Sequence, residues 1–129
     1  MGRDPESIVE AFAQASIESD ELSIVKGATR RQHSAQHRKE ANVRDLLPVW
    51  DQGGHEALLA RIEDPHPAVR AAAAVYLLES DPGLAMKTLE AVASETKGVR
   101  WHTSVTATTC LNEWKAGRLR PLERLRQGK

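Results

Sequence analysis

The chain has 129 residues, of which 40% are hydrophobic, and its 18 basic and 18 acidic residues give a formal net charge of zero. The single cysteine, Cys110, excludes an intrachain disulfide, and no stretch approaches the roughly 18 consecutive apolar residues of a membrane span. The first residues are acidic where a signal peptide needs a basic and then an apolar run, so we expect one cytoplasmic domain that makes no contact with a membrane.

The first predicted helix begins at about Pro5 and continues at least to residue 19. Asp4 is a suitable N-cap, and proline is favoured in the first turn of a helix because the missing amide is not needed there. The apolar residues recur at helical spacing and predict one buried stripe: Ile8, Val9, Phe12 and Ala15. Gly27 ends this part of the chain.

A second, longer helix is predicted over residues 29–50. Its first half, TRRQHSAQHRKE, is nearly all polar and is expected to face solvent. Its apolar residues come late: Val43, Leu46, Leu47 and Trp50. Pro48 lacks an amide donor and is therefore expected to kink or end the helix.

The next two helices are predicted on either side of residues 64–67, after a turn at residues 51–54. The sequence Asp-Pro-His-Pro breaks the helical pattern, because proline donates no amide hydrogen bond and pushes the preceding residue out of helical geometry. Residues expected to be buried are Leu58, Leu59 and Ile62 before the break, and Val69, Ala72, Ala73, Tyr76 and Leu77 after it.

Two further helices complete an all-α chain of about six helices. The fifth begins at residues 81–82 and ends in SETKG, and the sixth spans about 99–115 with Gly117 as its stop. Their predicted inward residues are Leu84, Leu89 and Val92, and then Trp101, Val105, Cys110, Leu111 and Trp114. Residues 118–129 form a basic tail that adds at most one short turn.

A weak internal repeat relates the last four predicted helices. At an offset of thirty residues, identical or similar residues coincide: Leu59 with Leu89, Ile62 with Val92, Val69 with Val99, Arg70 with Arg100, and Val75 with Val105. Each coincidence falls at the same place in a helix–turn–helix unit, which is the pattern of a helical-repeat protein.

The segment DPHPAVRAAAAVYLLE (64–79) resembles the second helix of a HEAT repeat. Together with ANVRDLL and LNEWKAG, it makes residues 41–117 similar to a small bacterial HEAT-like family of unknown function, although SETKGVRWHT is more polar than that family. The resemblance implies a single HEAT-like α-solenoid domain with an N-terminal long helix pair (1–50), HEAT-like helix pairs (54–117) and the basic tail (118–129). Such modules mostly bind proteins, and some small members are immunity proteins that neutralise bacterial toxins.

Charge is strongly segregated along the chain, which guides the choice of a binding surface. Net charge is −4 over residues 1–27, +4 over 28–44, −4 over 45–66, −1 over 67–98 and +5 over 99–129. An acidic ridge that carries tryptophan would suit a basic, nuclease-like protein partner. The candidate partner-binding residues are Trp50, Asp51, His55, Glu56, Glu63, Asp64, Trp101 and His102. Our first hypothesis is therefore a non-enzymatic, immunity-type protein.

The alternative hypothesis is a nucleic-acid binder that uses the basic helix and tail. Its candidate residues are Arg30, Arg31, Arg38, Lys39, Arg118 and Arg120, followed by Arg124, Arg126 and Lys129. The net charge of zero argues against nucleic-acid binding, because such binding depends on a strongly basic surface that releases counterions from the phosphates.

Enzyme and metal functions have weaker support. His33 and His37 share a helix face and Glu40 lies one turn on, but no third ligand is fixed by the sequence, and a solvated basic face is the expected interpretation. Cys110 would be a nucleophile only if a histidine such as His102 approached it, and a buried, inert thiol is expected instead. We therefore predict no catalytic residues, no metal and no cofactor, and the oligomeric state stays open.

Overall fold

The computed structural model describes residues 3–95 and 98–127, and it confirms the all-α prediction. These residues form seven α-helices and two short 3-10 helices, with no strand among them. None of the described helices is both long and apolar enough to pass through a bilayer. The chain divides into two compact units, a first unit that ends at Ala60 and a second unit that begins at Arg61.

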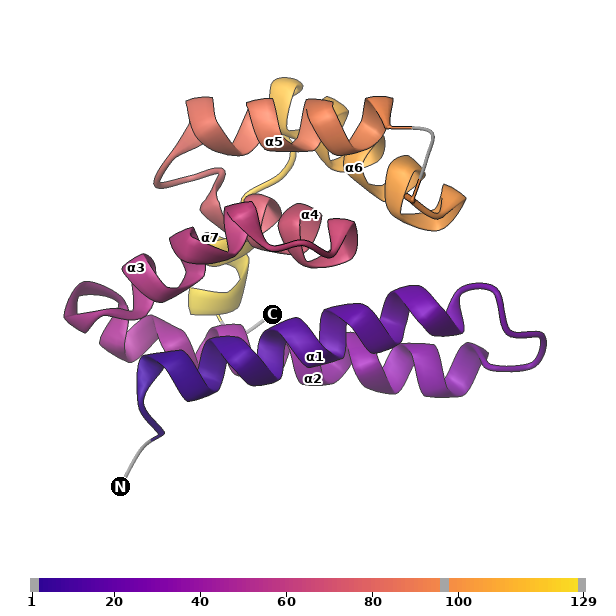
Figure 1. The fold of residues 1–129 in the computed structure, drawn as a ribbon. Helices are drawn as coiled ribbons and strands as arrows, with labels where there is room; N and C mark the ends of the chain where they lie inside the picture. The colour runs from indigo at the N-terminus through magenta and orange to yellow at the C-terminus, as the bar shows by residue number, and fades with distance from the viewer. Residues whose placement is uncertain (1–2, 96–97, 128–129) are drawn as a thin grey trace. The chain divides into compact units, whose positions relative to one another are not determined.

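The first unit is built on a helical hairpin, in which α1 (Pro5–Leu22) and α2 (Thr29–Leu46) lie side by side (Figure 1). The predicted cap is present, because the Ser7 amide donates to Asp4 Oδ1 at 2.8 Å. The predicted stripe of α1 is buried as well: Ile8, Val9, Phe12 and Ala15. Periodicity and capping signals therefore placed this helix correctly.

The predicted second helix was too long at its C-terminal end. The α-helix ends at Leu46, and residues 47–52 form the 3-10 helix η1 (Leu47–Gln52), which has Pro48 in its first turn. Proline offers no amide to the i−4 carbonyl, so the α-helical ladder stops there, as the sequence indicated. Gly53 then takes a left-handed conformation with φ 109° and leads into α3 (Gly54–Leu59), which packs on α1.

The second unit contains the remaining helices. After η2 (Ala60–Glu63) and the predicted break at residues 64–67, the chain forms α4 (Pro67–Leu77), α5 (Pro82–Ser94), α6 (Trp101–Lys115) and α7 (Pro121–Arg126). Helix α4 packs on α5, α6 and α7, and α5 packs on α6. The largest fully buried side chains of this unit are Val69, Leu77, Leu78, Leu89, Val92 and Leu122.

Three residues predicted to face inward are exposed: Leu84 by 44%, Val105 by 39% and Trp101 by 80%. Leu84 lies in the first turn of α5. In α6 the buried stripe is Thr103, Ala107 and Leu111, which turns Val105 toward solvent. Small residues let α6 pack closely against its neighbours, so its inward face is not the one with the larger side chains.

The predicted basic tail is a packed helix. Leu122 and Leu125 of α7 are buried. The Leu122 amide donates to Glu79 Oε1 at 2.7 Å and the Glu123 amide donates to Glu79 Oε2 at 3.3 Å, so a carboxylate from the end of α4 caps α7. Gly117 has φ 79° and is placed after α6, as predicted.

Candidate partner-binding surfaces

The first surface is the Trp50 cluster, which consists of Trp50, Asp51, His55 and Glu56. The left-handed turn at Gly53 brings η1 and α3 together, so that the rings of Trp50 and His55 stack with centroids 5.1 Å apart and an interplanar angle of 30°. Both rings are half-buried, whereas Asp51 and Glu56 are exposed. An aromatic platform beside two carboxylates is suited to contact a lysine or arginine side chain of a partner.

Two other residues of the predicted ridge, Glu63 and Asp64, belong to the second unit. The Asp64 carboxylate accepts hydrogen bonds from Arg61 Nη1 at 3.0 Å and from the His66 amide at 2.9 Å. Its role is therefore to hold the turn between η2 and α4, as expected of an aspartate before proline. Glu63 is exposed.

The second surface is the outward side of α6, where Trp101 is 80% exposed. Residues at the spacing of one helix face continue the surface from Trp101 as far as Asn112, and no Asp, Glu, Lys or Arg occurs in residues 101–112. We call this the α6 outer face; its exposed residues are Trp101, His102, Val105, Thr106, Thr108, Thr109 and Asn112. The sequence indicated Trp101 and His102 as contact residues, but not the other five residues of this face.

Hydrogen bonds fix the orientation of the α6 outer face. The Ser104 hydroxyl donates to the Ala93 carbonyl of α5 at 3.1 Å, on the side of α6 where Thr103 and Ala107 are buried. The Thr108 hydroxyl donates to the Ser104 carbonyl at 3.0 Å within the helix. The absence of charged residues from Trp101 to Asn112, in a chain that is 28% charged, was the sequence signal for this surface.

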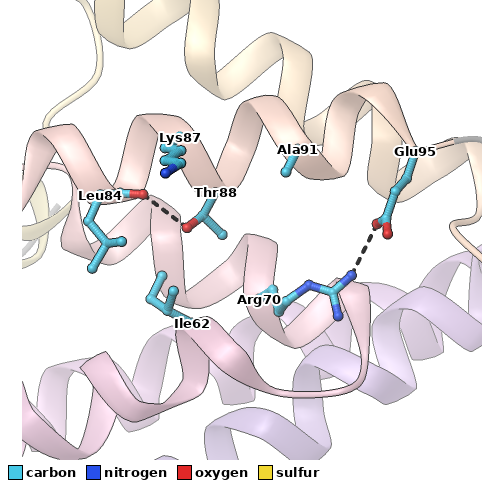
Figure 2. A pocket seen from close by; sticks show the side chains of 7 residues that line it. All are labelled: Ile62, Arg70, Leu84, Lys87, Thr88, Ala91 and Glu95. Atoms are coloured by element: carbon cyan, nitrogen blue, oxygen red, sulfur yellow. Dashed lines mark hydrogen bonds and ion pairs between the residues drawn. The ribbon is translucent and has the colours of Figure 1, made fainter.

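A groove of about 480 Å³ lies beside α4 and α5 in the second unit (Figure 2). Its lining comes from η2, α4 and α5: Ile62, Arg70, Leu84, Lys87, Thr88, Ala91 and Glu95. The Arg70 guanidinium pairs with Glu95 at 3.1 Å and donates to the carbonyls of Asp64 and Pro65 at 2.9 and 3.1 Å. Leu84 is exposed because it lines this groove.

Several basic residues of the nucleic-acid alternative already interact with other side chains of the chain. Arg38 pairs with Glu18, Arg118 pairs with Glu113, and the Arg120 guanidinium lies 4.6 Å from the centre of the Trp114 ring. Lys39 is half-buried. By contrast, Arg30 and Arg31 are exposed. Lys129 lies outside the described residues.

The described residues assemble neither the candidate metal site nor the candidate pair of Cys110 with His102. His33 and His37 are exposed, and within residues 3–95 and 98–127 no group of three or more His, Cys, Asp or Glu side chains is placed to hold a metal ion. Cys110 is half-buried rather than buried. It lies eight residues after His102 on the same helix, which separates the two by about 12 Å along the axis, so His102 does not reach the thiol.

Comparison with known proteins identifies no relative of this chain. No model of a protein family, no curated protein and no solved structure matches the chain. What the chain does must therefore follow from its own surfaces.

Proposed function

We propose that this chain is a non-enzymatic protein-binding module of HEAT-like architecture, and that the α6 outer face is its main contact surface. The observation that carries the proposal is the 80% exposure of Trp101 in a stretch of α6, residues 101–112, that has no charged residue. Helices packed in sequence, α4 on α5 and α5 on α6, support the HEAT-like part of the proposal.

The physical argument rests on the cost of removing water. A helix face that stays in solvent usually carries lysine and glutamate, whose charges are costly to bury in an interface. The centres of protein interfaces are depleted of these residues, and tryptophan is enriched among the residues that contribute most to binding. The α6 outer face has this composition, with Val105 one turn after Trp101.

The threonines of α6 add to the same argument. The Thr108 hydroxyl already donates to the Ser104 carbonyl, so its hydrogen-bond donor stays satisfied when a partner covers the helix. Covering this part of the helix therefore leaves no unpaired hydroxyl donor at Thr108, and the cost of such an unpaired group is avoided.

For the partner, we propose a basic protein of the bacterial-toxin type, whose activity is blocked on binding. The support is the family resemblance of residues 64–79 together with the Trp50 cluster, in which exposed Asp51 and Glu56 flank a stacked aromatic pair. Exposed carboxylates increase the rate of association with a basic partner more than they increase the final affinity.

The experiment compares capture of a protein partner by three purified forms of the chain. The wild type and the control variant L84S should retain the same stoichiometric partner, whereas W101S/V105S should lose it. Leu84 is a matched control because it is an aliphatic residue of similar exposure to Val105. Truncation of a tryptophan at the centre of an interface typically weakens binding by about 2 kcal/mol or more.

Three outcomes would contradict the proposal. Equal capture by W101S/V105S and wild type would remove the α6 outer face from consideration. A partner that keeps its toxicity when bound would rule out the inhibitor function, and recovery of nucleic acid alone, released by salt, would favour the alternative hypothesis. With an authentic partner, D51K/E56K should slow association and leave the melting temperature nearly unchanged; an unchanged association rate would exclude the Trp50 cluster.

A further inference from the structure

The turn between α1 and α2 exposes two adjacent aliphatic side chains. Ile24 is 68% exposed and Val25 is 47% exposed, which makes Ile24 the most exposed large aliphatic residue in the described part of the chain. Neither side chain contributes to the core of the first unit, and the proposed protein-binding surface on α6 does not include them. We refer to residues 23–31 as the hairpin apex.

The apex has a defined backbone conformation. The Val25 amide donates to the Leu22 carbonyl at 3.1 Å, and the Ala28 amide donates to the Val25 carbonyl at 3.3 Å. Gly27, with φ 81°, completes the reversal of the chain. These bonds hold Ile24 and Val25 at the end of the hairpin. Because α1 has 18 residues, this end lies about 27 Å along the helix axis from Pro5 (Figure 1).

Three cations follow the two aliphatic residues in the chain. Lys26, Arg30 and Arg31 are all exposed, and none of them forms an ion pair with a described residue. Of the two acids in the last turn of α1, Asp20 is buried and only Glu21 is exposed. The exposed charge at the apex is therefore positive, with three cations against one carboxylate.

We propose that the hairpin apex docks on the surface of an anionic lipid bilayer. Ile24 and Val25 enter the boundary between headgroups and acyl chains, and Lys26, Arg30 and Arg31 contact lipid phosphates. Exposed apolar side chains beside unpaired cations are the combination that binds such interfaces without spanning them. The proposal replaces the prediction that this chain makes no membrane contact, and it does not depend on the α6 outer face.

The apolar pair distinguishes a lipid surface from nucleic acid. A phosphate backbone would engage the arginines but would leave Ile24 and Val25 in water, and it would gain little from Arg38, which is already paired with Glu18. An anionic bilayer offers a contact to both kinds of residue in the apex, because its headgroups attract the cations and the layer beneath them is apolar, like the aliphatic pair.

The test is co-sedimentation of the full chain with phosphatidylcholine vesicles that contain or lack phosphatidylglycerol. Binding is expected only to the anionic vesicles. Each cation near an anionic surface contributes about a fivefold increase in partitioning, so K26E/R30E/R31E should weaken binding by at least about a hundredfold. I24S/V25S should weaken binding by at least about tenfold, at unchanged net charge.

Matched controls come from the second unit. L84S removes an exposed aliphatic residue, and K87E/K115E/R126E makes the same change in net charge with exposed cations; both should bind more tightly than the corresponding apex variant. Circular dichroism should show the same helix content for all variants, because every substituted side chain is exposed. An environment-sensitive dye on the I24C variant, in a C110S background, should shift to the blue with anionic vesicles.

Several results would overturn the proposal: no binding to anionic vesicles, equal binding by I24S/V25S and wild type, or equal weakening by the apex and control charge variants. Tighter binding to a DNA duplex than to vesicles, unaffected by I24S/V25S, would assign the apex arginines to nucleic acid instead. Capture of a protein partner by the α6 outer face is unaffected by the two apex variants, so the two proposals can fail separately.

Discussion

Asp4 determines where α1 begins, and its effect on stability should depend on pH. The Ser7 amide and hydroxyl, as hydrogen-bond donors, lower the pKa of the Asp4 carboxyl below its ordinary value of 3.8. A lowered pKa in the folded state means that the carboxylate stabilises the fold at pH values above the unfolded value, and that this contribution is lost as the pH falls through the lowered pKa.

We therefore expect D4A to lower the melting temperature at about pH 7 and to have little effect at about pH 2. D4S is the matched control, because a serine hydroxyl caps a helix without titrating in this range. The melting temperature of D4S should therefore be higher than that of D4A at both pH values. Thermal unfolding followed by circular dichroism provides the measurement. A destabilisation by D4A that is the same at both pH values would show that the carboxylate charge has no role.

Two glycines in helices should respond to the same substitution with opposite signs. A Cβ on Gly54 would lie 2.9 Å from the Val49 carbonyl oxygen and 3.2 Å from the Leu46 side chain, whereas a Cβ on Gly83 would have no neighbour within 4 Å. Urea denaturation should show that G54A loses about 1–3 kcal/mol and that G83A gains about 0.5–1 kcal/mol. If G54A and G83A changed the free energy of unfolding equally, η1 would move away from α3 at no cost in free energy.

At the scale of elements, α7 depends on a carboxylate that lies 43 residues earlier in the chain. E79A removes both hydrogen bonds to the Leu122 and Glu123 amides and should cost about 1–2 kcal/mol. E79Q keeps one acceptor oxygen and should cost less. Hydrogen exchange should show faster exchange at the α7 amides in E79A than in the wild type. Unchanged protection would mean that burial of Leu122 and Leu125 alone holds the helix.

The elements also show what the sequence could and could not predict. Helix α1, the break at residues 64–67 and the stop at Gly117 were predicted because capping residues, prolines and glycines act locally. The inward side of α6 was predicted only at Leu111, because Thr103 and Ala107 provide no hydrophobic contrast and the Ser104 bond to Ala93 connects two helices.

The candidate surfaces were predicted only in part, for the same reason. Trp101 and His102 were identified from residue type alone, whereas the pairing of Asp64 with Arg61 and His66 depends on the geometry of the turn. A short turn in the tail was anticipated, but the packing of α7 was missed, because its two leucines occur among arginines and the capping carboxylate of Glu79 is far away in sequence.

At the scale of the whole molecule, the two compact units should differ in unfolding. Trp50 belongs to the first unit, and Trp101 and Trp114 belong to the second. The fluorescence of W101F/W114F, which keeps Trp50, therefore reports on the first unit, and the fluorescence of W50F reports on the second. L77A should remove about 2–4 kcal/mol from the second unit and should lower the urea midpoint in the W50F background more than in the W101F/W114F background. Equal shifts would indicate the single cooperative domain that the sequence predicted.

The distance in sequence between Glu79 and α7 also has a consequence for biosynthesis. Ribosomes add about 5–20 residues per second, so the 43 residues from Glu79 to Leu122 require about 2–9 seconds. When that interval begins, α4 is already made, but α5, α6 and the helix α7 that packs on α4 do not yet exist. The nascent chain therefore passes through a stage with apolar surface at the end of α4 open to chaperones, and folding of the second unit is completed only when α7 has emerged.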